Sequence, residues 1–189
     1  MSNTQSIRKI IDTTLFIIYN ITMKNQSYYN EQTIVNTNKL RNVLMDFPDF
    51  ALDFFTGIEN NTSTLTRLNY AYYLRIFFNW ALTQTNLFRD KNELMDLEVK
   101  DLERFRTTHF ERYMSYLTSY LDSDGNVVTN GERGKARKIA SVRSFFKYYF
   151  RHEMISVDLA SKIQMPKIHE KPIIRLEDNE VVKFLNMVN

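Results

Sequence analysis

The scarcity of glycine and proline most constrains what this chain can fold into. Its 189 residues include only four glycines and three prolines. That is too few for the many tight turns of a β-sandwich or a barrel. Hydrophobic residues make up 43% of the chain, so a buried core can form. We therefore expect an all-α fold built from long helices with few tight turns.

The absence of cysteine removes several classes of site. A chain with no cysteine and three separated histidines holds no disulfide, no thiolate metal ligand and no cysteine nucleophile. The uninterrupted apolar stretch near the N-terminus, Leu15–Tyr19, is far shorter than the roughly 20 residues of a membrane span. We expect a cytoplasmic protein with no metal, no cofactor, no small-molecule substrate and no membrane partner.

Apolar periodicity and turn signals divide the chain into helices. They predict helices over residues 4–23, 31–45, 49–58, 64–83, 100–120 and 135–151, with a short connector at 94–97. The pair Phe47-Pro48 ends the second helix, because proline disfavours helix at the residue before it. Asp124-Gly125 and Asn130-Gly131 predict an exposed loop with a small hairpin before the last of these helices.

The helix predicted over residues 64–83 is apolar in almost every direction, which is typical of a helix buried at the centre of a domain. One line along it has a different character. Arg67, Ala71 and Arg75 are spaced by four residues and should share one face. We expect this line to escape the core and to present a cation, a small residue and a second cation.

Positive charge is concentrated in one short segment of the chain. Residues 132–151 carry seven Lys or Arg and one acid, although the net charge of the whole chain is only +3. Such a patch is the expected footprint of a phosphate-binding surface. An ordinary solvated helix face would normally mix Glu with Lys, yet no acid lies between Glu132 and Glu153. The composition of this segment favours nucleic acid as the partner.

The helical wheel of this basic segment separates two faces. The expected core side consists of Ile139, Val142, Phe146, Tyr149 and Phe150. The opposite side consists of Arg137, Ala140, Arg143, Ser144, Lys147 and Arg151. Small residues at its centre would let the helix enter the roughly 12 Å major groove while cations reach phosphates on either strand. The predicted DNA-binding residues are this face together with Lys135, Lys138, Arg67, Ala71 and Arg75.

Three blocks of sequence carry a resemblance to a known family. They are LTRLNY at 65–70 with FFNWAL at 77–82, then KARKIASVRSFFKYY at 135–149, then DLA at 158–160 with MPK at 165–167 and LEDNEV at 176–181. Their order and spacing resemble the core-binding (SAM-like) domain of Xer/phage-integrase-type tyrosine recombinases. The second block is the most specific. Leu65 and Leu159 depart from the family pattern, which has Asn and Pro at these positions.

The resemblance implies an orthogonal bundle of about four core-binding helices with extra N-terminal helices. It divides the chain into an N-terminal extension (1–45), the DNA-binding core domain (46–164), a linker (165–175) and the first helix of a truncated catalytic domain (176–189). It implies that the intact protein clamps double-stranded DNA with other protomers, in DNA recombination or integration for a mobile element or host process. It also implies strand exchange through a 3′-phosphotyrosine made outside this chain, so the fragment itself should not be an enzyme.

Two alternatives remain open from the sequence. A free-standing helical DNA-binding regulator would keep the basic face but form stable dimers. A helical protein-interaction module would use the same face for an acidic protein or not use it. His109-Phe110-Glu111-Arg112 spells the family's H-x-x-R, but it lies in the wrong helix, before the core-binding motif ends, and lacks the glycine-rich context that follows the family's own H-x-x-R. We interpret it as a coincidence.

Overall fold

The computed structural model describes residues 28–169, and the helices predicted over residues 4–23 and 176–189 lie outside this range. Residues 28–44 are helical. The α-helices that follow are α2 (Asp49–Gly57), α3 (Thr64–Gln84), α4 (Thr107–Tyr116) and α5 (Glu132–Arg151). Short 3₁₀ turns are η1 (Glu59–Asn61), η2 (Leu94–Asp96), η3 (Val99–Arg104) and η4 (Ala160–Lys162). The strands β1 (Ser119–Leu121) and β2 (Val127–Thr129) form one antiparallel hairpin. The all-α prediction is confirmed.

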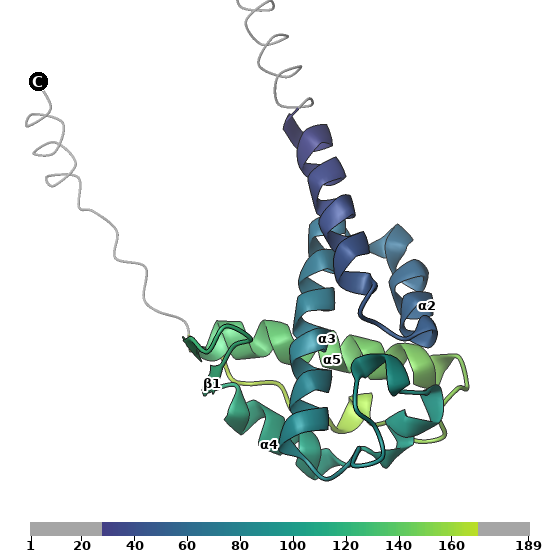
Figure 1. Cartoon of the computed structure of the whole chain (residues 1–189), viewed down its shortest axis with the longest axis vertical. Helices are drawn as coiled ribbons and strands as arrows, with labels where there is room; N and C mark the ends of the chain where they lie inside the picture. The colour runs from purple at the N-terminus through teal and green to yellow at the C-terminus, as the bar shows by residue number, and fades with distance from the viewer. Residues whose placement is uncertain (1–27, 170–189) are drawn as a thin grey trace, which may run out of the picture.

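Helix α3 is the central element, as its apolar sequence predicted. It stands upright in Figure 1 and α5 crosses it. Ser63 caps its N-terminus, because the Ser63 hydroxyl accepts a hydrogen bond from the Thr66 amide. The crossing is filled by aromatic side chains. The ring centroids of Phe77 and Phe146 lie 6.1 Å apart, and those of Phe78 and Phe145 lie 5.4 Å apart.

The single helix predicted over residues 100–120 is wrong. The chain instead forms η3, passes through extended backbone at Phe105 and Arg106, and then forms α4. The interruption lets Phe105 enter the core, where its ring packs near Phe77, Phe88 and Phe146. A side chain caps the start of each of the two pieces, η3 and α4. Asp101 accepts the Glu98 amide hydrogen bond, and His109 accepts that of Arg106.

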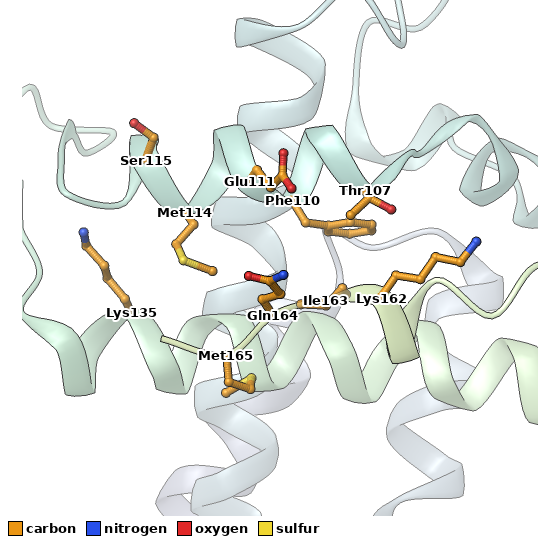
Figure 2. A pocket seen from close by; sticks show the side chains of 10 residues that line it. All are labelled: Thr107, Phe110, Glu111, Met114, Ser115, Lys135, Lys162, Ile163, Gln164 and Met165. Atoms are coloured by element: carbon orange, nitrogen blue, oxygen red, sulfur yellow. The ribbon is translucent and has the colours of Figure 1, made fainter. Parts of the chain in front are cut away.

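The N-terminal helix and the chain after α5 complete the core. Leu40 and Val43 from the helical residues 28–44 are buried in the same hydrophobic cluster as α3. After α5, the chain returns through η4, and Figure 2 shows Ile163 and Gln164 lying between α4 and α5. Ile163 is buried there. None of the helices between residues 28 and 169 combines the length and the apolar character that a membrane span requires.

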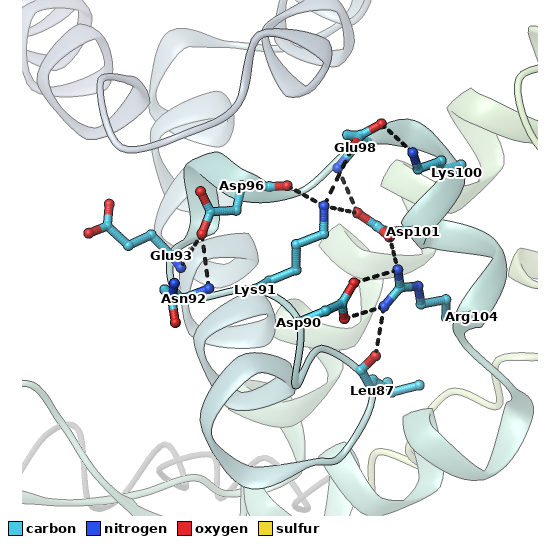
Figure 3. A network of polar contacts seen from close by, with 10 residues as sticks. All are labelled: Leu87, Asp90, Lys91, Asn92, Glu93, Asp96, Glu98, Lys100, Asp101 and Arg104. Carbon is cyan, nitrogen blue, oxygen red and sulfur yellow. Dashed lines mark hydrogen bonds and ion pairs between the residues drawn. The ribbon is translucent and has the colours of Figure 1, made fainter.

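A polar network fastens the long connection between α3 and α4 (Figure 3). Arg104 forms two hydrogen bonds to Asp90, at 2.6 and 2.9 Å, and an ion pair with the buried Asp101 at 2.9 Å. Lys91 approaches Asp101 from the other side at 3.3 Å and donates to the Asp96 carbonyl. The connection contains little regular structure, so these charge-assisted contacts hold it against the core.

Truncation of Phe77 should test the aromatic crossing. Phe77→Ala removes a fully buried ring that has six aromatic neighbours. We expect the free energy of unfolding to fall by about 3–5 kcal/mol, measured by urea denaturation. Leu65→Ala on the same helix is the control, since Leu65 is 53% exposed. A loss for Phe77→Ala no larger than that of the control would contradict the central role of this ring.

Asp90 makes the stability of the network depend on pH. The hydrogen bond from Arg104 lowers the pKa of Asp90 from 3.8 to about 2. The folded-state pKa lies below the ordinary value, so this contribution is present above about pH 4 and is lost as pH falls towards 2. Asp90→Asn should therefore be less stable than the wild type at neutral pH and converge with it near pH 2, as measured by urea denaturation. The control is Asp124→Asn at an exposed position of the hairpin turn, which should leave the free energy of unfolding at neutral pH within about 0.5 kcal/mol of the wild type.

Candidate nucleic-acid interface

The outward face of α5 carries a row of cations that have no acidic partner among residues 28–169. Arg137, Arg143, Lys147 and Arg151 are all exposed, as the helical wheel predicted. Arg133, one turn before Arg137, joins them and was not among the predicted site residues. Within residues 28–169, none of these five side chains forms an ion pair or a hydrogen bond. Their positive charge is therefore uncompensated by neighbouring groups of this domain.

Small residues lie at the centre of this face. Ala140 and Ser144 are half-buried and lie between the flanking cations on the wheel. Their short side chains bring the backbone of α5 close to the surface, while the longer Arg and Lys side chains can reach further on either side. We define the outward residues Arg133, Arg137, Ala140, Arg143, Ser144, Lys147 and Arg151 as the basic face.

The opposite side of α5 holds the basic face in its orientation. Ile139, Val142, Phe145, Phe146 and Tyr149 are fully buried. The Tyr149 hydroxyl donates a 2.6 Å hydrogen bond to the Phe50 carbonyl, and burial raises the pKa of this hydroxyl, so it stays neutral. The prediction that Phe150 faces the core is wrong. It is 37% exposed, because the buried side of α5 centres on Phe145 and Tyr149 and Phe150 lies at its edge, beside the direction of Arg143.

The predicted second row of cations, on α3, has a different environment. Ala71 is fully buried, so the expectation that it lies on an exposed line is wrong. Arg67 pairs with Glu59 at 2.6 Å, and Arg75 pairs with Asp46 at 3.2 Å. The segments before and after α2 supply these carboxylates, and periodicity within α3 could not reveal them. Both guanidinium groups are engaged inside the domain.

Lys135 and Lys138 also make contacts inside the domain. The Lys135 ammonium donates to the Thr118 hydroxyl at 2.7 Å. Lys138 is only 9% exposed, and its ammonium donates to the Asn130 side-chain oxygen at 2.6 Å. The same ammonium lies 5.0 Å from the centre of the Tyr73 ring on α3. At 100° per residue, Lys138 falls between the buried Phe145 and Tyr149, so the helical wheel carried a signal that the run of charge obscured.

Sequence reasoning missed a polar face of α3 beside α5. Tyr73 shares one side of α3 with Thr66 and Asn69, and all three are half-buried. The contact between Tyr73 and Lys138 places this side of α3 next to α5. The spacing of three and four between residues 66, 69 and 73 was the signal in the sequence that these polar side chains share one face of the helix.

The pocket beside α4 offers no constellation of catalytic groups. Its volume is about 350 Å³, and Figure 2 shows apolar side chains such as Met114 and Phe110 with Lys135 and Lys162 at its ends. His109 of the H-x-x-R sequence lies on the same helix but serves as its cap through the Arg106 amide. Burial lowers the pKa of His109 and favours the neutral ring that accepts this hydrogen bond. Among residues 28–169, no cluster of His, Asp and Glu could hold a metal ion.

The fold and the site define a class: an all-α domain that presents one helix face with uncompensated positive charge. Comparisons with known proteins are more specific. A tyrosine recombinase XerC from Caldanaerobacter subterraneus subsp. tengcongensis is 25% identical over 144 residues, which cover 73% of this chain and 38% of that protein. Tyrosine recombinases XerC from two serovars of Leptospira interrogans, copenhageni and Lai, are each 23% identical over 131 residues, or 69% of this chain and 35% of theirs.

These matches confirm the resemblance that the three sequence blocks predicted. The chain is homologous to Xer-type tyrosine recombinases, at low identity. It spans little more than a third of the length of the curated relatives it matches. No family model and no solved structure matches the chain.

Proposed function

We propose that this chain contains the core-binding domain of a site-specific tyrosine recombinase and that the basic face of α5 binds duplex DNA beside the crossover site. The observation that carries this proposal is the row of exposed cations on α5 without a single acidic partner among residues 28–169. Like charges one turn apart on a helix repel each other. Such a row is favourable when a polyanion neutralises it, and duplex DNA is the polyanion that the relatives' name indicates.

The shape of the basic face matches the major groove. Ala140 and Ser144 lie nearest the groove floor, and Arg137, Arg143, Lys147 and Arg151 contact phosphates on the two sides. Contacts of this kind position a protein on DNA and make binding depend on salt, but they specify little sequence. Thr66, Asn69 and Tyr73 on α3, beside α5, are better placed as a second wall than Arg67 and Arg75, which are held by carboxylates.

The wider assignment follows the relatives. We propose that residues 46–164 are the DNA-binding unit, with the helical residues 28–44 packed onto it, and that residues 165–175 link it to a catalytic domain that begins near residue 176. The intact recombinase would act in the cytoplasm with other protomers on DNA and exchange strands through a 3′-phosphotyrosine. The nucleophile and its activating residues would then lie outside the core-binding domain, which holds the DNA for them.

Charge reversal on α5 should abolish most of the affinity for DNA. We expect Arg143→Glu/Lys147→Glu to weaken duplex binding about ten-fold or more, and to reduce the slope of log affinity against log salt by about 0.9 for each phosphate that the variant no longer neutralises. Fluorescence anisotropy with labelled duplex at low and raised salt measures both. The matched control is Arg41→Glu/Arg112→Glu, the same charge change at two exposed cations away from α5. Absence of wild-type binding at low salt would contradict the DNA assignment, and equal loss in both variants would contradict the role of α5.

Neutralisation of the α3 arginines should matter much less. Arg67 and Arg75 are already paired with Glu59 and Asp46, so Arg67→Gln/Arg75→Gln should keep DNA affinity within about two-fold of the wild type. The same anisotropy titration measures it. A loss as large as that of the α5 variant would show that these arginines leave their carboxylates to contact DNA.

A further inference from the structure

Lys138 lies at a junction of three elements. It comes from α5, its ammonium bonds to Asn130 at the end of the β1–β2 hairpin, and it lies over Tyr73 of α3. The Asn130 amide in turn donates to the Leu117 carbonyl at 2.7 Å, which ties the end of the hairpin to the end of α4. Gly134, one turn before Lys138, makes room for this arrangement, because a Cβ there would lie 3.2 Å from the Asn130 side-chain oxygen.

The charge of Lys138 has no counter-ion at this junction. Its hydrogen-bond acceptor is a neutral amide and its other neighbour is an aromatic ring, and no carboxylate among residues 28–169 lies within ion-pair distance. Burial therefore lowers the pKa of the Lys138 ammonium. Lys91, the other well-enclosed lysine, has Asp101 and Glu98 beside it. A buried cation without an anion is unfavourable for folding, and an apolar side chain of similar length would fill the same space at lower cost.

The groups that face Lys138 add no negative charge. Tyr73 contributes a phenol from α3, and Tyr120 of β1 lies near Tyr73 and Asn130. Asp122 of the hairpin acts on Tyr120 and forms no ion pair with Lys138 among the described residues. Burial raises the pKa of Tyr120, so it remains neutral. Arg137 belongs to the basic face, and Tyr73 shares its side of α3 with Asn69. The unpaired ammonium therefore lies where the polar side of α3 meets the basic helix.

We propose that Lys138 is the counter-charge for one DNA backbone phosphate bound at the junction of α3 and α5, with the Tyr73 hydroxyl as a second donor. This inference rests on the proposed function and gives one position within that interface. Ammonium and phenol donors suit a phosphate oxygen. The stability lost by burying the charge in the free protein is recovered when DNA supplies the anion. The sequence placed Lys138 in the DNA-binding set as part of a charge run, whereas the structure gives it a separate location and a separate role.

Proton linkage gives this site a measurable signature. An approaching phosphate favours the charged form, so the pKa of Lys138 should rise when DNA binds. DNA binding then takes up a proton at any pH between the free and bound pKa values. The affinity for DNA should be highest below the free-state pKa of Lys138. It should fall as pH rises from the free-state pKa to the DNA-bound pKa, by up to about ten-fold per pH unit. The free-state pKa lies below the ordinary lysine value of 10.5, so this decline begins below that value.

The first experiment uses the wild-type chain. Lysine side-chain signals in ¹³C- and ¹⁵N-labelled protein are followed against pH, with and without a duplex, and the Lys138 signal is assigned by its loss in Lys138→Met. We expect Lys138 to titrate below the ordinary lysine value of 10.5 in the free protein and at higher pH with DNA. If the wild type binds DNA but the titration of Lys138 does not move, this inference alone is overturned. If the wild type does not bind DNA, the proposed function and this inference fall together.

The second experiment separates function from packing. Lys138→Met keeps the length of the side chain and removes the charge, and Lys162→Met is the matched control at an exposed lysine on η4. We expect Lys138→Met to bind duplex about ten-fold more weakly, with a salt slope lower by about 0.9 and no extra pH dependence. Its melting temperature should equal or exceed that of the wild type, because the buried charge is gone. The inference would be overturned if Lys138→Met melted at a lower temperature than the wild type but bound DNA with wild-type affinity at temperatures where it is folded. Lys138 would then only stabilise the fold.

Discussion

The crossing of α3 and α5 is the interaction on which the rest of the structure depends. Four phenylalanines, two from each helix, fill it, and every one is buried. This packing buries one side of α5 and so leaves the opposite side, with its cations, in solvent. It also brings α3 within reach of Lys138. Large aromatic side chains at a helix crossing therefore determine both the core and the position of the charged surface.

The charges of this domain fall into two groups. Elsewhere among residues 28–169, five Lys and Arg side chains pair with carboxylates, as Arg104 does with Asp90 and Arg67 with Glu59. The basic face of α5 has none among the described residues, because the helix carries no acid after its first residue. A surface that repels itself in the free protein is favourable only when a polyanion covers it. This difference, together with the homology to tyrosine recombinases, is why DNA is the best-supported partner.

The accuracy of sequence reasoning depended on the range of the interactions involved. Periodicity is local, so it predicted α3, α5 and the outward direction of Arg137, Arg143, Lys147 and Arg151. It failed where a distant contact decided the outcome. Phe105 interrupts a predicted helix because its ring packs in the core, and Phe150 is exposed because the buried side of α5 centres on Phe145 and Tyr149. The predicted DNA-binding row on α3 failed for the same reason, because Arg67 and Arg75 form ion pairs with Glu59 and Asp46 from outside the helix.

By itself, the sequence determined that this is a helical protein, that its positive charge lies on one helix, and that it resembles the recombinase family. These properties follow from composition, helical spacing and the order of residues along one chain. Only the tertiary structure decided which cations are available. Arg133 and Arg137 lie in solvent and have no partner in the described part of the chain, whereas Lys138 is enclosed between Asn130 and Tyr73. Long flexible side chains with the same charge differ in function once the packing around them is known.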